Sequence, residues 1–303
     1  MKKVKYLRNS EIDYKKWDFC INQSVNAKVY AYSWYLDLVA SSWDCIVYDD
    51  YKLVFPVVFK KYFFVFKTLY QPVFCQQLGP FSSSTLLLKN ENILDNIFTI
   101  LIAKFSKYEF AINHVVCNKL IQNNYLFKKK INFTKRINLE LDLSAKYETL
   151  YNQYNLNTKR NLKLSQNFSI RELDDVNYFV NSYKSHLNHI VKLKETEYDV
   201  MHKIITNCLQ KNIGTIQGVF NSKNELLAAY FMIKTLKRHI LLFNFSNPKF
   251  HKYSPMTYLI NNYIMLNSKK LEVLDFEGSN LSGVKRFYKG FGAIEKNYIY
   301  IHN

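Results

Sequence analysis

Two carboxylates, Asp275 and Glu277, lie at the end of an apolar run over 271–275 that has the composition of a β-strand. Ligands in α/β folds bind outside the carboxyl ends of strands, so these side chains are candidates for contact with a substrate. Either carboxylate could accept the proton that an amine loses when it attacks a carbonyl carbon. The structural alternative is that Asp275 caps the next turn and Glu277 pairs with Lys285 or Arg286.

The residues after these carboxylates supply further groups for binding. Gly278 and Ser279 are expected to form a flexible turn. A short amphipathic helix is expected after this turn, over 283–289. We expect the segment 275–289 to form one wall of a cleft, because a strand end, a glycine turn and a short helix would bring the Glu277 carboxylate, backbone amides and the Phe287 ring into one small region. The candidate binding residues of this segment are Ser279, Arg286, Phe287 and Lys289.

A second group of candidates precedes a helix predicted over 256–267. Ser254 and Pro255 favour a helix start, because a capping residue is followed by proline. The unpaired N–H groups and the positive end of a helix attract anions, and basic side chains lie just before this start. The residues before this start that could supply charge or a cap are Lys249, His251, Lys252 and Ser254, with an ordinary solvated loop as the alternative.

A third candidate is a basic stretch within a helix predicted over 145–166. The apolar side chains of this helix lie on one face, at Tyr147, Leu150, Tyr151 and Tyr154. Lys159 and Arg160 follow towards its end and could hold a phosphate. The alternative is that these cations only complement the dipole of their own helix.

The predicted elements have a similar order in the two halves of the chain. The second half contains a three-strand meander, a helix, a strand, a short helix and a final strand, with the meander at 214–220, 226–233 and 239–245. The first half contains a hairpin at 44–48 and 53–59, a helix at 92–107 and a strand at 110–116. These patterns predict an α/β fold with mixed sheets in two domains, 1–144 and 145–303.

Composition and charge agree with a folded, basic protein. The chain has 303 residues, of which 48% are hydrophobic, so it can build the cores of two domains. Its net charge of +18 favours polyanionic partners such as RNA, the phosphates of CoA or an anionic membrane face. The alternative is a lysine-rich composition with no binding role.

Cysteine usage and hydropathy exclude several classes of protein. The five cysteines are far apart and show no spacing that indicates structural zinc or a disulfide framework, so no metal is expected. The N-terminus lacks the apolar core of a signal peptide, and no run approaches the roughly 20 apolar residues that span a bilayer. We expect a cytoplasmic protein that can make peripheral contact with an anionic membrane.

The order of elements in the second half, with the run from Asp275 to Ala293, resembles the GNAT superfamily of N-acyltransferases. Within it the chain is similar to the Fem-like group, whose members carry two tandem GNAT-type domains. In that group phenylalanine-lysine precedes phenylalanine-glycine. Phe287 and Phe291-Gly292 match this pattern, but Tyr288 stands where the lysine would be, and Arg286 and Lys289 could compensate for the lost cation.

The resemblance implies that the phosphates of acyl-CoA rest on the helix start after the meander. The matching segment, 249–256, departs from the family pattern R/Q-x-x-G-x-G/A because Ser254 and Met256 replace glycines, and Pro255 removes one N–H donor. The resemblance also implies a basic helix, here with Lys159 and Arg160, that lines a groove between the domains.

The function implied by the resemblance is transfer of an acyl or aminoacyl group from acyl-CoA or aminoacyl-tRNA to an amine. The acceptor is expected in the cleft between the two domains. The best-known Fem-like proteins add amino acids to a peptidoglycan precursor, which implies a cell-envelope acceptor. The alternative from another class is a catalytically degenerate GNAT-fold binding protein, favoured by the missing glycines near Ser254.

Overall fold

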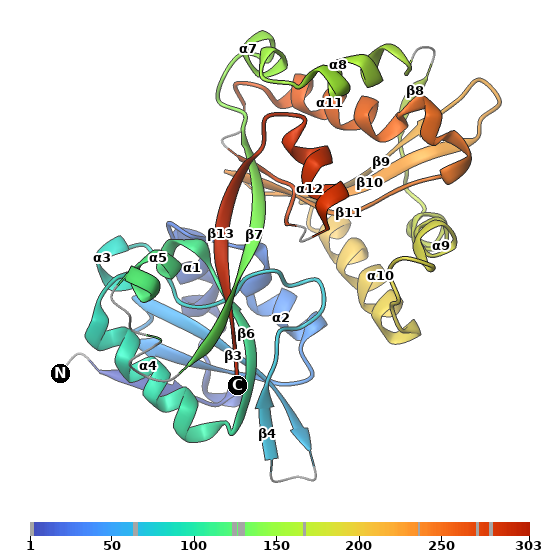
Figure 1. Cartoon of the computed structure of the whole chain (residues 1–303). Coiled ribbons are helices and arrows are strands. Elements are labelled where there is room, and N and C mark those ends of the chain that lie inside the picture. The colour runs from blue at the N-terminus through green and yellow to red at the C-terminus, as the bar shows by residue number, and fades with distance from the viewer. Residues whose placement is uncertain are drawn as a thin grey trace. The chain divides into compact units, whose positions relative to one another are not determined.

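The chain folds into two compact units, seen in a computed structural model (Figure 1). The structure describes residues 3–62, 66–122, 126, 131–165, 168–235, 237–270, 273–278 and 281–303. Unit 1 comprises residues 1–136 and 297–303, and unit 2 comprises residues 137–296. The expected domain boundary at 144–145 therefore lies inside unit 2, and the end of the chain returns to unit 1.

Unit 1 is built on a mixed sheet with the strand order β1-β2-β3-β4-β6-β13, in which β5 also pairs with β3. Neighbouring strands are antiparallel except β4 and β6. The strands are β1 (Val4–Leu7), β2 (Trp43–Tyr48), β3 (Leu53–Tyr62), β4 (Phe66–Leu69), β5 (Phe81–Ser82), β6 (Lys107–Ile112) and β13 (Ile294–His302). The helices are α1 (Tyr14–Gln23), α2 (Ser33–Val39), α3 (Thr85–Leu88), α4 (Glu91–Lys104) and α5 (His114–Gln122), with short 3-10 helices η1 (Asn9–Glu11) and η2 (Val29–Ala31).

The hairpin predicted in unit 1 is confirmed, and its turn has a clear local cause. β2 and β3 pair from Trp43↔Val58 to Tyr48↔Leu53. The connecting residues Asp49 and Asp50 have φ values of 45° and 50°. Aspartate tolerates this left-handed conformation better than most residues, which fits its position in the turn.

The strand predicted at 110–116 is shorter than expected. β6 ends at Ile112, and the valines that suggested a strand begin helix α5 instead. The buried Asn113 turns the chain at this point because its side-chain amide donates to the carbonyl oxygens of Leu78 and Pro80, both at 3.1 Å. Tertiary hydrogen bonds thus override the β preference of two valines.

The strands of unit 2 form mixed β-structure with the order β7-β12-β11-β10-β9-β8. The predicted meander is confirmed, and only β11 and β12 are a parallel pair among the strand pairs described. The strands are β7 (Asn132–Asp142), β8 (Ser169–Glu172), β9 (Gly214–Phe220), β10 (Leu226–Lys234), β11 (Arg238–Ser246) and β12 (Val273–Asp275). The helices are α7 (Tyr147–Asn152), α8 (Leu156–Lys163), α9 (Val176–Leu187), α10 (Glu195–Gln210), α11 (Pro255–Asn267) and α12 (Ser282–Lys289), with the 3-10 helix η3 (Pro248–Tyr253).

The core of unit 2 lies on both faces of its sheet. Figure 1 shows α7, α8 and α11 on one face and α9 and α10 on the other. Every residue of β10 from Leu226 to Ile233 is buried, because helices cover this strand on both sides.

None of the helices in the described part of the chain is both long and apolar enough to cross a membrane.

The single helix predicted over 145–166 is wrong, since the structure divides this segment into α7 and α8. Asn155 lies between them in an extended conformation, and its side-chain oxygen accepts a 2.8 Å hydrogen bond from the N–H of Thr158. Asparagine is among the preferred N-cap residues, so it begins a new helix here. The predicted apolar face still packs inward, with Leu150 and Tyr154 buried and Tyr154 against Phe291.

Candidate functional site

The sheet of unit 2 opens between β11 and β12. These parallel strands pair only from Arg238↔Val273 to Ile240↔Asp275, although β11 continues to Ser246. After Asp275 the chain stays with β7, because the N–H of Phe276 donates to Leu139 (2.9 Å) and the carbonyl of Glu277 accepts from Leu139 (2.8 Å). The far half of β11 therefore parts from β12, and the described backbone groups beyond Ile240 and Asp275 no longer pair across these two strands.

Helix α12 places Tyr288 beside this opening. The side-chain amide of Asn244, on the far half of β11, donates to the Tyr288 hydroxyl at 3.1 Å. Tyr288 is only 5% exposed and stacks on Phe276 with ring centroids 4.5 Å apart. Burial raises the pKa of Tyr288 to about 12, and the charge of Glu277 adds to this rise. The position that would hold a lysine in the resembling group thus holds a neutral hydroxyl.

Asp275 belongs to a buried ionic cluster, here called the Arg238 triad, which consists of Arg238, Glu140 and Asp275. The Nη1 atom of Arg238 lies 2.6 Å from Asp275 Oδ2 and 2.7 Å from Glu140 Oε1. The other Asp275 oxygen accepts from the N–H of Glu277 at 2.9 Å. Burial alone would lower the pKa of Arg238, but the two carboxylates raise it by more than burial lowers it. The pKa therefore lies above its ordinary value, and the guanidinium stays charged. These contacts make Asp275 an ion-pair partner that also caps the following turn.

Sequence reasoning missed the other two members of this triad. Strict alternation along β7 would place Asn138 and Glu140 on a solvated face, yet both are buried. Asp275 lies opposite Glu140 in the register, a pairing between distant segments that no local pattern of the sequence indicates. Two neighbouring carboxylates inside a sheet require a cation, and Arg238 supplies it.

Glu277 has a strained backbone and lies near Tyr288. Its φ is 56°, a left-handed value that is uncommon outside glycine, and the residue is half-buried. Lys285, one of the structural partners considered for Glu277, pairs with Glu295 at 2.9 Å. The backbone at Glu277 is held on both sides by hydrogen bonds to Leu139 and Asp275, which fixes where its carboxylate can project.

The flexible turn predicted at Gly278 and Ser279 is wrong for Gly278. A Cβ atom on Gly278 would lie 1.6 Å from the carbonyl oxygen of Ile137, so this residue packs tightly against β7. Glycine is required here by close approach of two backbones. Ser279 lies outside the described residues.

A pocket of about 550 Å³, here called the α12 pocket, lies on the other side of α12. Helix α8 lines the pocket with three side chains, and its N-cap residue adds a fourth. Helix α12 lines the rest. The lining residues are Asn155, Asn157, Thr158, Asn161, Gly283, Arg286 and Phe287. The lining is polar except for Phe287. Among the described residues, no carboxylate pairs with Arg286, so its guanidinium can receive an anion or a carbonyl oxygen.

Two contacts hold the walls of this pocket together. The N–H of Asn155 donates to the carbonyl of Gly290 at 3.0 Å, which joins the start of α8 to the end of α12. A Cβ atom on Gly290 would lie 2.4 Å from the Thr158 hydroxyl, so glycine permits this approach. The α12 pocket is therefore a fixed feature of unit 2.

The other basic candidates of this region differ in how they relate to the α12 pocket. Arg160 reaches the rim of the α12 pocket, since its guanidinium donates to Asn157 at 2.6 Å. Lys159 instead donates to the carbonyl of Asn152 at 3.3 Å, at the end of α7. Lys289 pairs with Glu295 at 3.1 Å.

The predicted phosphate site before α11 has a different local structure from the one expected. Ser254 has a left-handed backbone with φ 51°, and its side chain makes no capping hydrogen bond to any described residue. Its carbonyl instead accepts from the N–H groups of Thr257 (3.0 Å) and Tyr258 (3.3 Å). The prediction of a side-chain cap at Ser254 is therefore wrong, because the backbone alone closes this first turn.

The three basic residues before α11 lie in or beside η3. Lys252 stacks over the ring of Tyr253 at 4.9 Å, and His251 lies 3.4 Å from the carbonyl of Ser246. Burial lowers the pKa of His186, and the positive charges of Lys249 and His251 lower it further, which places both near the end of α9. Lys249, His251 and Lys252 do not line the α12 pocket. No group of three or more metal-binding side chains is found among the described residues.

Comparisons with known proteins address the fold. The crystal structure of FemX matches with a TM-score of 0.71 at 11% identity, covering 98% of this chain and 96% of FemX. A conserved protein of unknown function from Bacteroides thetaiotaomicron VPI-5482 matches with a TM-score of 0.60 at 10% identity, covering all of both chains. The C-terminal domain of a putative lysylphosphatidylglycerol synthetase from Agrobacterium fabrum matches at 0.50 and 10% identity, covering 86% and 84%.

Neither a protein-family model nor a curated protein sequence matches this chain. The structural likeness extends over nearly the whole length of FemX, so the chain has a Fem-like fold of two GNAT-like units. The fold predicted from the sequence is confirmed.

Proposed function

We propose that this protein is an N-acyltransferase whose reaction centre lies around α12 in unit 2. The observation that carries the proposal is the parting of β11 and β12 after Ile240 and Asp275, with Asn244 and Tyr288 placed at the opening. The fold shared with FemX supports an acyltransferase more than another class, although folds alone do not fix function. A donor carbonyl at this opening would meet hydrogen-bond donors instead of a paired strand.

The proposed step is attack of an amine on the carbonyl carbon of an acyl or aminoacyl donor. The N–C bond forms, and the bond from the carbonyl carbon to the leaving sulfur or oxygen breaks. The amine nitrogen gives one proton to Glu277, and the leaving group takes one from solvent. Tyr288 keeps its proton at neutral pH because burial raises its pKa, so its hydroxyl can donate to the developing oxyanion. Asp275 is the second candidate for the base, although Arg238 already holds it.

The donor is proposed to be acyl-CoA or aminoacyl-tRNA, held by its phosphates. Arg286, with the amides of Asn157 and Asn161 in the same pocket, offers an anion site in unit 2. Phe287 would pack under the transferred group, and Arg160 would strengthen the rim. Lys159, Lys289 and Ser279 remain further candidates of this region, and Lys249, His251, Lys252 and Ser254 remain those before α11.

The acceptor is proposed to be an amine of a cell-envelope precursor. The name of the Agrobacterium fabrum protein indicates a lysyl group attached to a membrane lipid, and its C-terminal domain shares this fold. A cytoplasmic protein with a net charge of +18 could work at an anionic membrane face, where such precursors are found.

The donor is tested first by binding. A thermal-shift screen with CoA, acyl-CoAs and aminoacyl-tRNA should raise the Tm with one donor class, and Arg286→Gln should weaken that donor about tenfold. The matched control is Lys252→Gln, which removes a charge before α11. Equal weakening by both changes would show general electrostatics, and weakening by Lys252→Gln alone would move the donor to the start of α11.

The chemistry is tested by Glu277→Gln, which keeps size and hydrogen bonding but removes the base. We expect a rate loss on the order of 10²–10⁴ with an unchanged Tm. Glu295→Gln is the control, because Glu295 is also acidic but pairs with Lys285 and Lys289. Full turnover by Glu277→Gln would exclude Glu277 as the base.

A second function is a GNAT-fold binding protein without catalysis. Two observations favour it: Tyr288 replaces the lysine of the resembling group, and Ser254 and Pro255 replace the expected phosphate-binding pattern. It predicts that a donor binds and raises the Tm while no acyl transfer occurs to any amine offered. Transfer that is lost in Glu277→Gln would contradict it.

A further inference from the structure

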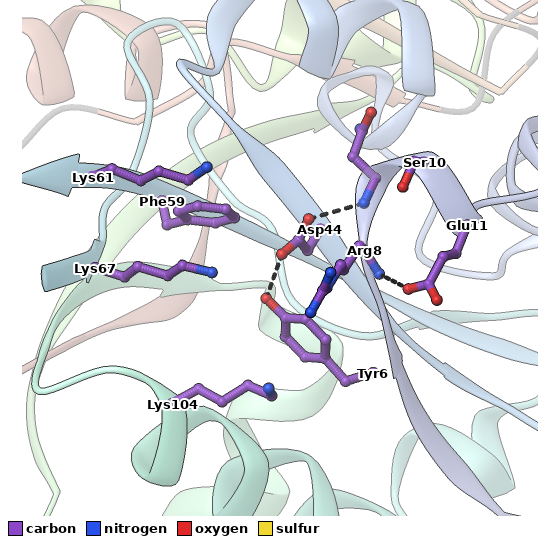
Figure 2. Close-up of a pocket in the computed structure, with 10 residues that line it drawn as sticks. Tyr6, Arg8, Ser10, Glu11, Asp44, Phe59, Lys61, Lys67 and Lys104 are labelled. Carbon is purple, nitrogen blue, oxygen red and sulfur yellow. Dashed lines mark hydrogen bonds between the residues drawn. The ribbon is translucent and has the colours of Figure 1, made fainter. Parts of the chain in front are cut away.

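Unit 1 contains its own pocket, here called the basic pocket, with a volume of about 620 Å³. It lies on elements that the proposed acyl transfer does not use, namely β1, η1, β2, β3, β4 and α4. The lining residues are Tyr6, Arg8, Asn9, Ser10, Glu11, Asp44, Phe59, Lys61, Lys67 and Lys104. Figure 2 shows Lys61, Lys67 and Lys104 extending toward the region of Arg8.

Four of the lining residues are cations, namely Arg8, Lys61, Lys67 and Lys104. Aromatic rings hold two of them in place. The ammonium of Lys104 lies 4.4 Å from the ring centroid of Tyr6, and that of Lys67 lies 4.8 Å from the ring of Phe59. Such contacts orient a long side chain and leave its N–H donors available. A lysine on a merely solvated surface would not be held over a ring of the same pocket.

The four cations lack acidic partners within the described chain. No carboxylate of a described residue forms an ion pair with Arg8, Lys61, Lys67 or Lys104. By contrast, Lys16 and Lys52 of the same unit pair with Asp50 and Asp49. Cations that converge on one concavity repel one another, and the pocket walls focus their field into it.

The two acids of the pocket are already engaged by other groups. Asp44 is buried and accepts hydrogen bonds from the Tyr6 hydroxyl at 2.6 Å and the N–H of Asn9 at 2.9 Å. Glu11 accepts from the N–H of Arg8 at 2.7 Å. Figure 2 shows these three bonds as dashed lines. Both carboxylates therefore shape the wall, and the four cations outnumber them.

We propose that the basic pocket binds a small phosphorylated ligand through a phosphate or diphosphate group. Arg8 can bind phosphate oxygens in a bidentate manner, and the three lysines supply further N–H donors. The volume falls within the range of small-molecule sites, whereas a nucleic acid would need an extended basic track. The ligand is identified by its phosphate chemistry, and it is either a soluble phosphate ester or the headgroup of a phospholipid.

The test uses the full chain and inorganic pyrophosphate as the probe, measured by isothermal titration at two salt concentrations. We expect binding that weakens as salt rises, and a loss of about tenfold or more in the double variant Lys67→Gln/Lys104→Gln. The control double variant, Lys89→Gln/Lys203→Gln, removes two exposed lysines outside both pockets and should bind as wild type does. Arg8→Gln, at an exposed side chain, serves as a second variant if the first one fails to fold.

Further binding measurements distinguish a soluble phosphate ester from a phospholipid headgroup. Glycerol 3-phosphate in solution and vesicles containing phosphatidic acid are compared, and the pocket variants should lose whichever of them binds. Absence of pyrophosphate binding would overturn the proposal, as would equal losses in the pocket and control variants. Tight binding of single-stranded RNA that the pocket variants leave unchanged, without pyrophosphate binding, would assign the positive charge to another role.

Discussion

The Arg238 triad and the basic pocket contain the same kinds of charged side chain, but these charges are paired in the triad and the cations are unpaired in the pocket. In unit 2, Arg238 is only 17% exposed and meets two carboxylates within 2.7 Å, so its charge is matched inside the protein. In unit 1, four cations converge on a pocket whose two acids accept hydrogen bonds from a hydroxyl and from backbone N–H groups of the same wall. A buried charge that is paired within the protein helps to fix the geometry of the fold. Cations around a concavity that have no acidic partner instead attract an anionic ligand.

This comparison predicts its largest effect for Arg238→Ala. Removing the guanidinium takes away the cation that the buried carboxylates of Asp275 and Glu140 share, and breaking a buried pair in this way costs about 3–5 kcal/mol. The free energy of unfolding from urea titration is the measurement. Arg8→Ala in the basic pocket is the matched control and should change it by about 0.5 kcal/mol or less. Similar losses in both variants would remove the distinction between the two regions.

The next effect concerns Gly278, whose neighbours position the triad and Glu277. We expect Gly278→Ala to destabilise unit 2 by about 3 kcal/mol or more, because its Cβ would lie 1.6 Å from the Ile137 carbonyl oxygen. Gly283→Ala is the matched control, since no described atom would lie within 4 Å of its Cβ. Alanine is also the better helix former in α12, so this control should be neutral or slightly stabilising. A tolerated Gly278→Ala would mean that the backbone after Asp275 can move.

The contrast between these two glycines also shows how far the sequence could lead. The order of strands and helices in unit 2 follows from local patterns, and it was predicted together with the Fem-like fold. The contact of Gly278 with Ile137 joins residues far apart in the chain, so no local pattern indicates it. The same holds for Arg238, which lies between two carboxylates contributed by β7 and β12.

The candidate site was predicted in part for the same reason. Arg286 and Phe287 lie in one short helix, and their joint position in the α12 pocket follows from that helix. The partner wall is α8, which was hidden inside a longer predicted helix because the capping role of Asn155 was not recognised. Tyr288 was noted as a replacement for lysine, but its burial against Phe276 depends on packing across unit 2.

A smaller effect is expected from pH, through His239, a half-buried histidine next to Arg238 in the sequence. His239 follows Arg238 in β11 and its ring bonds to the hydroxyl of Tyr263. Burial lowers the pKa of His239 from 6.5 to about 4, with a further contribution from Lys234. The unfolded chain therefore binds more protons between these values, so stability is full above about pH 6.5 and falls as the pH approaches 4.

The size of this loss is about 1–2 kcal/mol once the partial exposure of His239 is taken into account. The measurement is the free energy of unfolding at pH 7 and at pH 4.5, for the wild type and for His239→Gln. We expect the variant to be less stable at pH 7 and to lose less on acidification. His202→Gln, on α10, is the control for the loss of an imidazole elsewhere in unit 2, and its pH dependence is compared with that of His239→Gln. An unchanged slope in His239→Gln would assign the acid sensitivity to other groups.

The smallest effect is expected in the basic pocket when no ligand is present, and it has the opposite sign. Arg8, Lys61, Lys67 and Lys104 repel one another, so Lys61→Gln should leave stability unchanged or raise it slightly at low salt. Added salt should remove the difference, because a Debye length of about 8 Å at 0.15 M screens charges at an open pocket. The measurement is the Tm of both proteins at low and physiological ionic strength. A clear loss of stability in Lys61→Gln at low salt would show that this cation is already matched within the protein, and the contrast with the Arg238 triad would then fail.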